Sequence, residues 1–369
     1  MRLLLEKRSE HSRLMTVISP LIAVALTLVT GGFMFLAMGL NPFEALYVYF
    51  LEPLKFFWTF SADDFWPLEQ LAVKAAPLVL IGAGLTVAYS ANVWNIGAEG
   101  QFTAGAILGA ILPVYFTDWQ SPLTLITMLA LGAIGGMLWA AIPAFLKNRF
   151  GASEILTSLM LVYVSQLLLD WLVRGPWRDP EGHNFPQTVA FADWQVLPVF
   201  GDSGVHLGVL IAVIAAVALA FMMARTLKGF EIRTLGVSPR AGRFAGFSRS
   251  GSVWFCLLLS GGLAGLAGIG EVMNTVGQLQ PSISPGYGFT AIIVAFLGRL
   301  NPLGTLIAGL ALATSYLGGE AAQVSLGVSD KSARVFQGIL LFYVLACDTM
   351  ILYRPKFVMN RPVLADKPT

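Results

Sequence analysis

Charged residues are scarce in this sequence. Of its 369 residues, 12% are Asp, Glu, Lys or Arg, about half the share of a typical soluble domain, while 56% are hydrophobic. A chain so poor in charge is typical of a protein that lies mostly within a lipid bilayer. The 23 Lys and Arg nearly balance the 21 Asp and Glu, so the net charge of +2 argues against the basic surface of a nucleic-acid-binding protein.

Groups that carry catalysis or hold metals are also few. The three histidines, His11, His183 and His206, lie far apart in the sequence, and no H-E-x-x-H occurs. The P-loop pattern G-x-x-x-x-G-K-[ST] is absent, so the chain does not bind ATP in that way. Cys256 and Cys347 lie in apolar runs, where small hydrophobic residues in packed helices are a better interpretation than a disulfide. We therefore predict no catalytic residue, metal site or cofactor on this chain.

Long apolar runs dominate the chain. A helix needs about 20 apolar residues to cross a bilayer core. The eighth run, residues 287–297, is too short to cross in a straight line; it could be tilted, extended by its neighbours, or half of a re-entrant pair with the ninth. We predict an all-α integral membrane protein, a polytopic bundle of about ten transmembrane helices at residues 16–40, 71–91, 98–116, 123–146, 154–173, 206–224, 253–272, 287–297, 303–317 and 335–352.

The basic residues predict the orientation, because cytoplasmic loops of membrane proteins are enriched in Lys and Arg. With the N-terminus in the cytoplasm, 17 of the 23 Lys and Arg fall in predicted cytoplasmic stretches. We therefore expect a cytoplasmic N-terminal segment (1–15), a transmembrane domain (16–352) and a cytoplasmic tail (353–369). The cytoplasmic stretches are residues 1–15, 147–152, 225–252, 298–302 and 353–369.

Two predicted external loops are long enough to have structure of their own. Residues 41–70 are acidic and aromatic, and Trp58, Phe65 and Trp66 favour an interfacial helix lying on the outer leaflet. Residues 174–205 are rich in Pro and Gly and predict a compact loop. This second loop could be a lid over the outer mouth of the bundle or a docking surface for an external partner.

The cytoplasmic loop 225–252 contains signals for two short helices. Ser238 can cap the second helix, Pro239 suits its first position, and Gly246 suits a left-handed end. A preceding helix over residues 226–235 would end at Gly236 in the same way. Two such basic helices would offer a lever to a cytoplasmic motor, although composition alone favours a plain loop that only orients the protein.

A polar segment joins the second and third spans without a basic residue. Gly97 and Gly100 make a continuous helix doubtful, and broken helix at membrane depth is tolerated only where it is buried in protein or lines a wet cavity. We therefore predict that this segment borders a translocation path; the alternative is a plain cytoplasmic turn. Its candidate residues are Asn92, Asn95, Glu99 and Gln101.

Other residues inside or near the spans are less specific. Glu271 and Glu320 lie near span ends and could belong to the path or to the membrane boundary, and we include Glu271 among the path candidates. Three G-x-x-x-G pairs predict close helix packing: Gly105/Gly109, Gly132/Gly136 and Gly261/Gly265.

Residues 92–110, NVWNIGAEGQFTAGAILGA, closely resemble a hallmark of one group of permeases. This group is the nucleoside and simple-sugar branch of the branched-chain amino acid and ribose permease superfamily of ABC importers. Further similarity lies in residues 229–236, 241–246 and 286–292, and the resemblance runs from about residue 15 to residue 355. The N-I-G-A-E-G-Q form looks most like the nucleoside branch.

The resemblance implies a particular machine in a bacterial inner membrane. Two permease subunits, usually different chains, would sit on a cytoplasmic two-cassette ATPase that binds ATP and Mg²⁺, and a periplasmic or lipoprotein solute-binding protein would deliver a nucleoside or simple sugar. Another small polar solute, or an ion-coupled secondary transporter, are the alternatives. By this resemblance the loop 225–252 provides the ATPase-coupling residues Arg233, Gly236, Ser238, Arg240, Arg243 and Gly246.

The predicted orientation can be tested with an impermeant thiol reagent on intact cells. Gly182→Cys should be labelled because the loop 174–205 is predicted to be external, whereas Arg243→Cys should not. The parent chain, with Cys256 and Cys347 in apolar runs, gives the background labelling. Labelling of the Arg243→Cys variant from outside would reverse the orientation.

Overall fold

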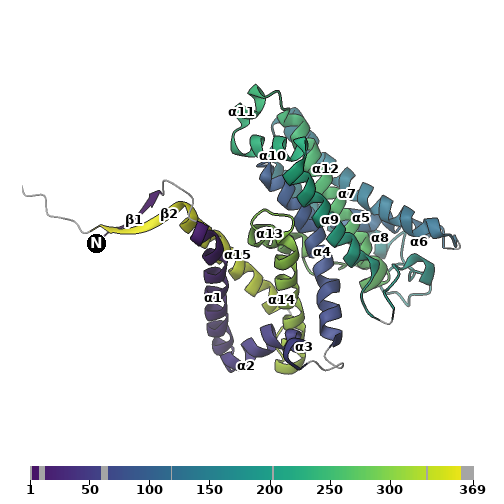
Figure 1. Cartoon of the computed structure of the whole chain (residues 1–369). Coiled ribbons are helices and arrows are strands. Elements are labelled where there is room, and N and C mark those ends of the chain that lie inside the picture. Colours follow the sequence, from purple (N-terminus) through teal and green to yellow (C-terminus); the bar gives the residue numbers. More distant parts are fainter. Residues whose placement is uncertain are drawn as a thin grey trace, which may run out of the picture. The chain divides into compact units, whose positions relative to one another are not determined.

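The computed structural model describes residues 2–7, 13–59, 65–117, 119–201, 203–329 and 331–358, and helices dominate it (Figure 1). Residues 359–369 of the predicted tail, 60–64 of the first external loop and 8–12 of the N-terminal segment lie outside the described residues. The predicted all-α membrane fold is confirmed, because the described residues include six helices that are long and apolar enough to cross a membrane.

The chain forms two compact units. Unit 1 contains the described parts of residues 1–47 and 331–369, and unit 2 contains those of residues 48–330. In unit 1, α1 packs against α15, and the Thr30 and Tyr343 hydroxyls hydrogen-bond at 2.8 Å. The elements of unit 1 are β1 (Arg2–Lys7), α1 (Arg13–Ala37), α2 (Pro42–Leu46), α15 (Lys331–Leu352) and β2 (Tyr353–Val358).

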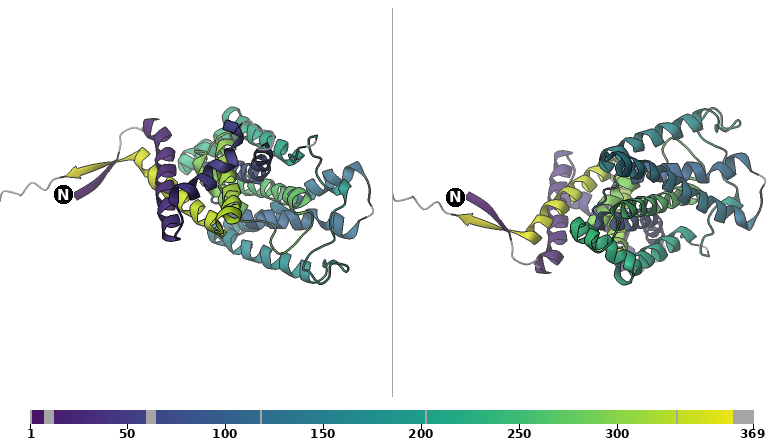
Figure 2. Two further views of the ribbon diagram at one scale, coloured as in Figure 1. Left: turned by 90° about the horizontal axis from the view of Figure 1, so that it is seen from below. Right: turned by 90° about the horizontal axis from the view of Figure 1, so that it is seen from above.

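The strands β1 and β2 form an antiparallel ribbon that the sequence analysis did not predict. Arg2 pairs with Val358 at one end of the ladder, and Lys7 pairs with Tyr353 at the other. Figure 2 shows the two strands side by side where β2 continues from α15. The ribbon therefore joins the two ends of the described chain.

Unit 2 is a bundle whose middle is made by α4, α5, α7 and α12. Most of α4 and nearly all of α5 are buried, which is unusual for lipid-facing helices. The elements of unit 2, with η1 starting one residue before it, are η1 (Tyr47–Leu51), η2 (Glu52–Leu54), α3 (Phe56–Thr59), α4 (Phe65–Ser90), α5 (Ala98–Gly109), α6 (Ile111–Tyr115), α7 (Pro122–Phe150), α8 (Glu154–Arg174), η4 (Asp193–Gln195), α9 (Leu207–Arg225), α10 (Leu227–Val237), α11 (Pro239–Phe244), α12 (Arg249–Glu271), η5 (Val272–Val276), α13 (Tyr287–Leu297) and α14 (Gly304–Leu326).

Glycine contacts explain how α5, α7 and α12 approach so closely. A Cβ on Gly105 would collide with the backbone of Gly265, and one on Gly136 would collide with the Gly261 carbonyl. Small residues let helix backbones touch, and this supplies packing that the bilayer itself does not drive. The predicted role of the G-x-x-x-G pairs is confirmed.

The loops of unit 2 gather at two ends. At the basic end, formed by residues 90–97, 147–153, 225–249 and 298–303, Gly236 of α10 packs against the Ser90 carbonyl, and the Phe296 ring stacks on Tyr89 at 5.5 Å. At the opposite end the Glu69 carboxylate accepts the Gly204 N–H at 3.0 Å. The loops predicted to be cytoplasmic thus lie together, away from the loop 174–205.

Two helices of unit 2 begin inside the bundle rather than at an end. The chain enters from the basic end as the extended segment 93–97, and α5 starts beside Ser260, halfway along α12. The α13 helix starts beside Glu99 after the non-helical residues 278–286. Its 11 residues span about 16 Å, whereas the 23 residues of α14 span about 34 Å, so the two helices are not equal halves of a re-entrant pair.

Two details of the predicted elements were wrong. The span 98–116 is divided into α5 and α6 at Ala110. The single interfacial helix expected in residues 41–70 is replaced by short helices, because Pro42 and Pro53 have no N–H to continue a preceding turn and so each lies in the first turn of a new one. Phe65 and Trp66 belong to the first turn of α4, and the Trp58 side chain lies outside the described residues.

The glycine contacts predict that Gly136→Leu destabilises the bundle. The added side chain must separate α7 from α12, and overpacking of this kind costs about 1–3 kcal/mol. The measurement is the melting temperature of the purified protein in detergent. Gly270→Ala is the matched control, since a Cβ there meets no atom within 4 Å; equal loss in both variants would contradict the packing argument.

Candidate functional site

The polar segment between α4 and α5 is held by a buried amide network. The Asn95 Nδ2 donates to Gln101 Oε1 and to Ser260 Oγ, both at 2.8 Å. In return the Gln101 Nε2 and the Gly97 N–H donate to Asn95 Oδ1, each at 3.0 Å. Because each buried amide group of Asn95 has a partner, this side chain fixes the non-helical segment to α12.

Glu99 joins the two broken helices. Its buried carboxylate accepts the Gly288 N–H at 2.6 Å, in the first turn of α13. The N-terminus of a helix carries exposed N–H groups and a partial positive charge, so a carboxylate there is stabilising. A Cβ on Gly288 would collide with the Glu99 backbone, so only glycine allows this approach.

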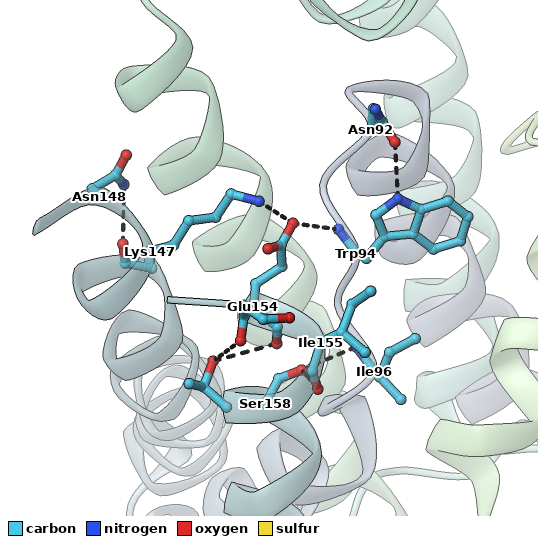
Figure 3. A network of polar contacts seen from close by, with 11 residues as sticks. Asn92, Trp94, Ile96, Lys147, Asn148, Glu154, Ile155 and Ser158 are labelled. Carbon is cyan, nitrogen blue, oxygen red and sulfur yellow. Dashed lines mark hydrogen bonds and ion pairs between the residues drawn. The ribbon is translucent and has the colours of Figure 1, made fainter. Parts of the chain in front are cut away.

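A second group of polar contacts lies at the basic end, where α7, α8 and the segment 92–97 meet. Figure 3 shows the Glu154 carboxylate between the Lys147 Nζ, with which it forms an ion pair, and the Trp94 N–H, at 3.5 Å. Ser158 Oγ accepts the Ile96 N–H at 3.3 Å. The side chain of Asn92 is exposed and accepts the Trp94 indole N–H at 2.8 Å.

The sequence analysis missed Glu154 and Lys147. Lys147 was counted only as an orientation signal, and Glu154 as the first residue of a span. A carboxylate in the first turn of a helix, seven residues after a lysine that ends the preceding helix, was the available signal.

Three aromatic rings pack together in the same region. Tyr89, Trp94 and Phe296 form a stacked group, with ring centroids 5.2 Å apart for Tyr89 and Trp94 and 6.2 Å apart for Trp94 and Phe296. Phe296 lies near the end of α13. The α13 helix is therefore held at its start by Glu99 and near its end by these rings.

Glu271 lies apart from the amide network. It is buried at the end of α12, beside Thr275 and Tyr287, the first residue of α13. On its other side it borders a small cavity of about 20 Å³, which His206 also lines. The five path candidates thus divide into the Asn95, Glu99 and Gln101 group, the exposed Asn92, and Glu271 beside the first residue of α13.

The coupling candidates lie on two short helices at the basic end. Ser238 accepts the Ala241 N–H at 3.3 Å and so caps α11 as predicted. Gly246 has a φ of +81°, and the Phe247 N–H returns to the Gly242 carbonyl at 3.0 Å, which closes the helix end as expected for a left-handed glycine.

Gly236 does not end its helix as predicted, while its predicted role in ATPase coupling stays a prediction. The α10 helix continues to Val237, so Gly236 lies inside it. A glycine is needed there because α10 packs directly on the carbonyl of Ser90 at the end of α4. Close approach, rather than helix termination, explains this residue.

The tips of these helices carry exposed apolar and basic side chains. Phe244 is 94% exposed and Val237 is 89% exposed. The basic side chains around them, Arg233, Arg240 and Arg243, are exposed as well. Exposed apolar side chains and arginines on the same two short helices are typical of a protein-binding surface.

A membrane bundle with two broken helices at its centre and a basic helix pair at one end has the form of a transporter's permease subunit. Residues 68–345 match the family described as branched-chain amino acid transport system / permease component, and the chain belongs to this family.

Three curated relatives agree with this membership. A glucose ABC transporter permease of Haloferax volcanii is 34% identical over 93% of this chain and 90% of its own length. A guanosine ABC transporter permease of Bacillus subtilis is 27% identical over 95% of this chain and 97% of its own. A nucleoside ABC transporter permease of Lactococcus lactis is 26% identical over 89% of this chain and 90% of its own.

The chain is therefore a multi-pass membrane subunit of an ABC importer, and it is a transport subunit rather than an enzyme. The predicted family is confirmed. Membership also implies an ATPase and a substrate-binding protein as partners.

The amide network predicts that Asn95→Ala destabilises unit 2. Removing the side chain leaves the buried Gln101 amide and the Ser260 hydroxyl without this partner, at about 1–3 kcal/mol. The melting temperature of the purified protein measures the loss. Asn92→Gly is the control, because Asn92 is exposed and its φ of +55° suits glycine. A control as unstable as Asn95→Ala would refute the special role of the network.

Proposed function

We propose that this chain forms half of the translocation path for a nucleoside or simple sugar. A second permease subunit, of a different sequence, completes the path. A two-cassette ATPase with ATP and Mg²⁺ drives it from the cytoplasm, and a periplasmic or lipoprotein binding protein delivers the solute. Both termini face the cytoplasm of a bacterial inner membrane. The position of the predicted cytoplasmic loops of unit 2 at one end supports this orientation.

The proposed solute class is drawn from the relatives. Those named for glucose and guanosine are 34% and 27% identical to this chain, and both compounds are neutral and carry several hydroxyl groups. A permease of this family therefore has one chemical feature to accommodate in either case, the hydroxyl-rich ring of a sugar or a ribose.

The path follows the two broken helices. In this proposal Asn95, Glu99 and Gln101 hold the wall of the path by fixing the starts of α5 and α13, while Glu271 faces α13 from the other side. Non-helical backbone inside a membrane bundle is typical of transporter pathways. Closure of the cassettes would shift the bundles between inward-open and outward-open packings as rigid bodies.

The observation that carries the proposal is the exposed tip of α10 and α11. Phe244 would fill a pocket on the ATPase, and Arg240 and Arg243 would orient the contact. The Ser238 cap and the Gly246 turn make the short helix stiff enough to transmit a push. Without a partner, the apolar side chain of Phe244 would stay in contact with water, which is unfavourable.

The coupling surface is tested by reversing its charge. Arg240→Glu with Arg243→Glu should leave the bundle folded, since both side chains are exposed, but should abolish ATPase copurification or lower binding-protein-stimulated ATP hydrolysis about tenfold or more. Phe244→Ser should act in the same direction.

Arg149→Glu is the matched control, because Arg149 is exposed at the same end but lies outside α10 and α11. It should copurify with the ATPase and couple as the parent does. Normal coupling by the double variant and by Phe244→Ser would mean that this loop is only an orientation signal.

A further inference from the structure

A charged pair lies inside unit 2 where apolar residues would be expected. The Lys74 Nζ bonds Glu320 Oε1 at 2.7 Å, joining α4 to α14. Lys74 is about 14 Å along α4 from Phe65, and Glu320 is about 9 Å from the end of α14 at Leu326. Ionisable residues at such positions are costly and are usually kept for function.

The pair belongs to a larger polar cluster. Tyr287 lies beside the buried Glu271 and meets the Tyr316 ring edge-on at 5.4 Å. Tyr316 lies one helical turn before Glu320 on α14, so the ion pair and the two tyrosine rings share one region. Four helices, α4, α12, α13 and α14, therefore contribute side chains to one place at the start of α13.

The cluster has one open side. The Lys74 side chain is 16% exposed, while the Glu320 side chain is 56% exposed. The two tyrosines and Glu271 behind it are buried. One edge of the Glu320 carboxylate thus faces outward while the groups behind hold it in place.

The chemistry of this side selects a class of solute. Glu320 and Lys74 balance each other's charge, so the pair offers no net positive charge to a phosphate group. The carboxylate edge accepts hydrogen bonds from hydroxyl groups, and the lysine ammonium donates to hydroxyl or ring oxygens. Neutral compounds with adjacent hydroxyls fit these groups, and phosphorylated ones do not.

We propose that Glu320 and Lys74, backed by Tyr287, Tyr316 and Glu271, form a hydroxyl-binding station on the translocation path. The proposal rests on the function proposed above and adds residues to it. A solute at the station lies near the first turn of α13, whose Gly288 N–H donates to the Glu99 carboxylate. The station therefore connects the solute to the start of α13, where the Glu99 carboxylate and the Ser284 hydroxyl accept the first N–H groups.

The test uses the complete transporter, with its ATPase, partner permease and binding protein, reconstituted in vesicles. ATP-driven uptake of labelled guanosine and of labelled glucose is measured for the parent and for Glu320→Gln, Glu320→Asp and Lys74→Met. Glu320→Gln should lower kcat/KM for the transported compound at least about tenfold, the scale of a lost charged hydrogen bond, and Glu320→Asp should recover part of it.

Asp170→Asn is the matched control. Asp170 is bonded to Arg174 at the same 2.7 Å, but on the exposed surface of α8, so uptake should stay within about twofold of the parent. Melting temperatures show whether a loss of uptake reflects unfolding. Unchanged uptake by Glu320→Gln, or a loss explained wholly by a smaller folded fraction, would overturn the station.

The two proposals fail in different ways. If the parent transports neither guanosine nor glucose, the solute class is wrong, and the station falls with it. If the parent transports one of them and the Glu320 and Lys74 variants do so equally well, the proposed function stands and the station alone is wrong.

Discussion

The hydrogen bond from the Gly288 N–H to the Glu99 carboxylate is the contact on which the centre of unit 2 depends. Backbone N–H groups inside a membrane bundle have no water to bind, so a helix that begins there needs an acceptor supplied by the protein. Glu99 supplies it for α13, and Asn95 does the same for the segment that leads into α5. Ser284 and Ser158 accept further N–H groups at the same two places, so side chains satisfy the backbone where both helices begin.

The polar contacts of Glu154 and Lys147 at the basic end likewise satisfy a backbone N–H group that no helix satisfies. Glu154 accepts the Trp94 N–H while Lys147 balances its charge, so the extended backbone before α5 is satisfied at both of its ends. Since α10 packs on Ser90, just before this segment, a push on the coupling helices reaches the broken helices through few contacts. The proposed ATPase surface and the proposed path are thus close to each other in the fold.

Helix positions could be predicted from the sequence better than contacts could. The α13 helix has the predicted bounds, and the cap at Ser238 and the turn at Gly246 are local signals that the structure confirms. The helix end was wrongly predicted at Gly236, because a glycine that ends a helix and a glycine that packs against another backbone cannot be distinguished in the sequence.

Contacts between residues far apart in the chain could not be predicted from the sequence. Lys74 and Glu320 are 246 positions apart, and each looks like an ordinary boundary charge when read alone. Asn95 and Ser260 likewise meet only in the folded bundle. The polar segment 92–101 was recognised as unusual, but whether its side chains face a solute or one another depends on α12, which lies some 150 residues later.

The β1–β2 ribbon restricts the number of times that the chain can cross the membrane. Two strands that exchange backbone hydrogen bonds must lie on the same side of a membrane, because an open ribbon cannot cross the hydrocarbon core. The chain between Lys7 and Tyr353 therefore crosses an even number of times, whichever side the ribbon occupies. A short helix such as α13 must then be counted together with its neighbouring segment, in such a way that the total number of crossings stays even. Any topology with an odd number of crossings would separate the two strands.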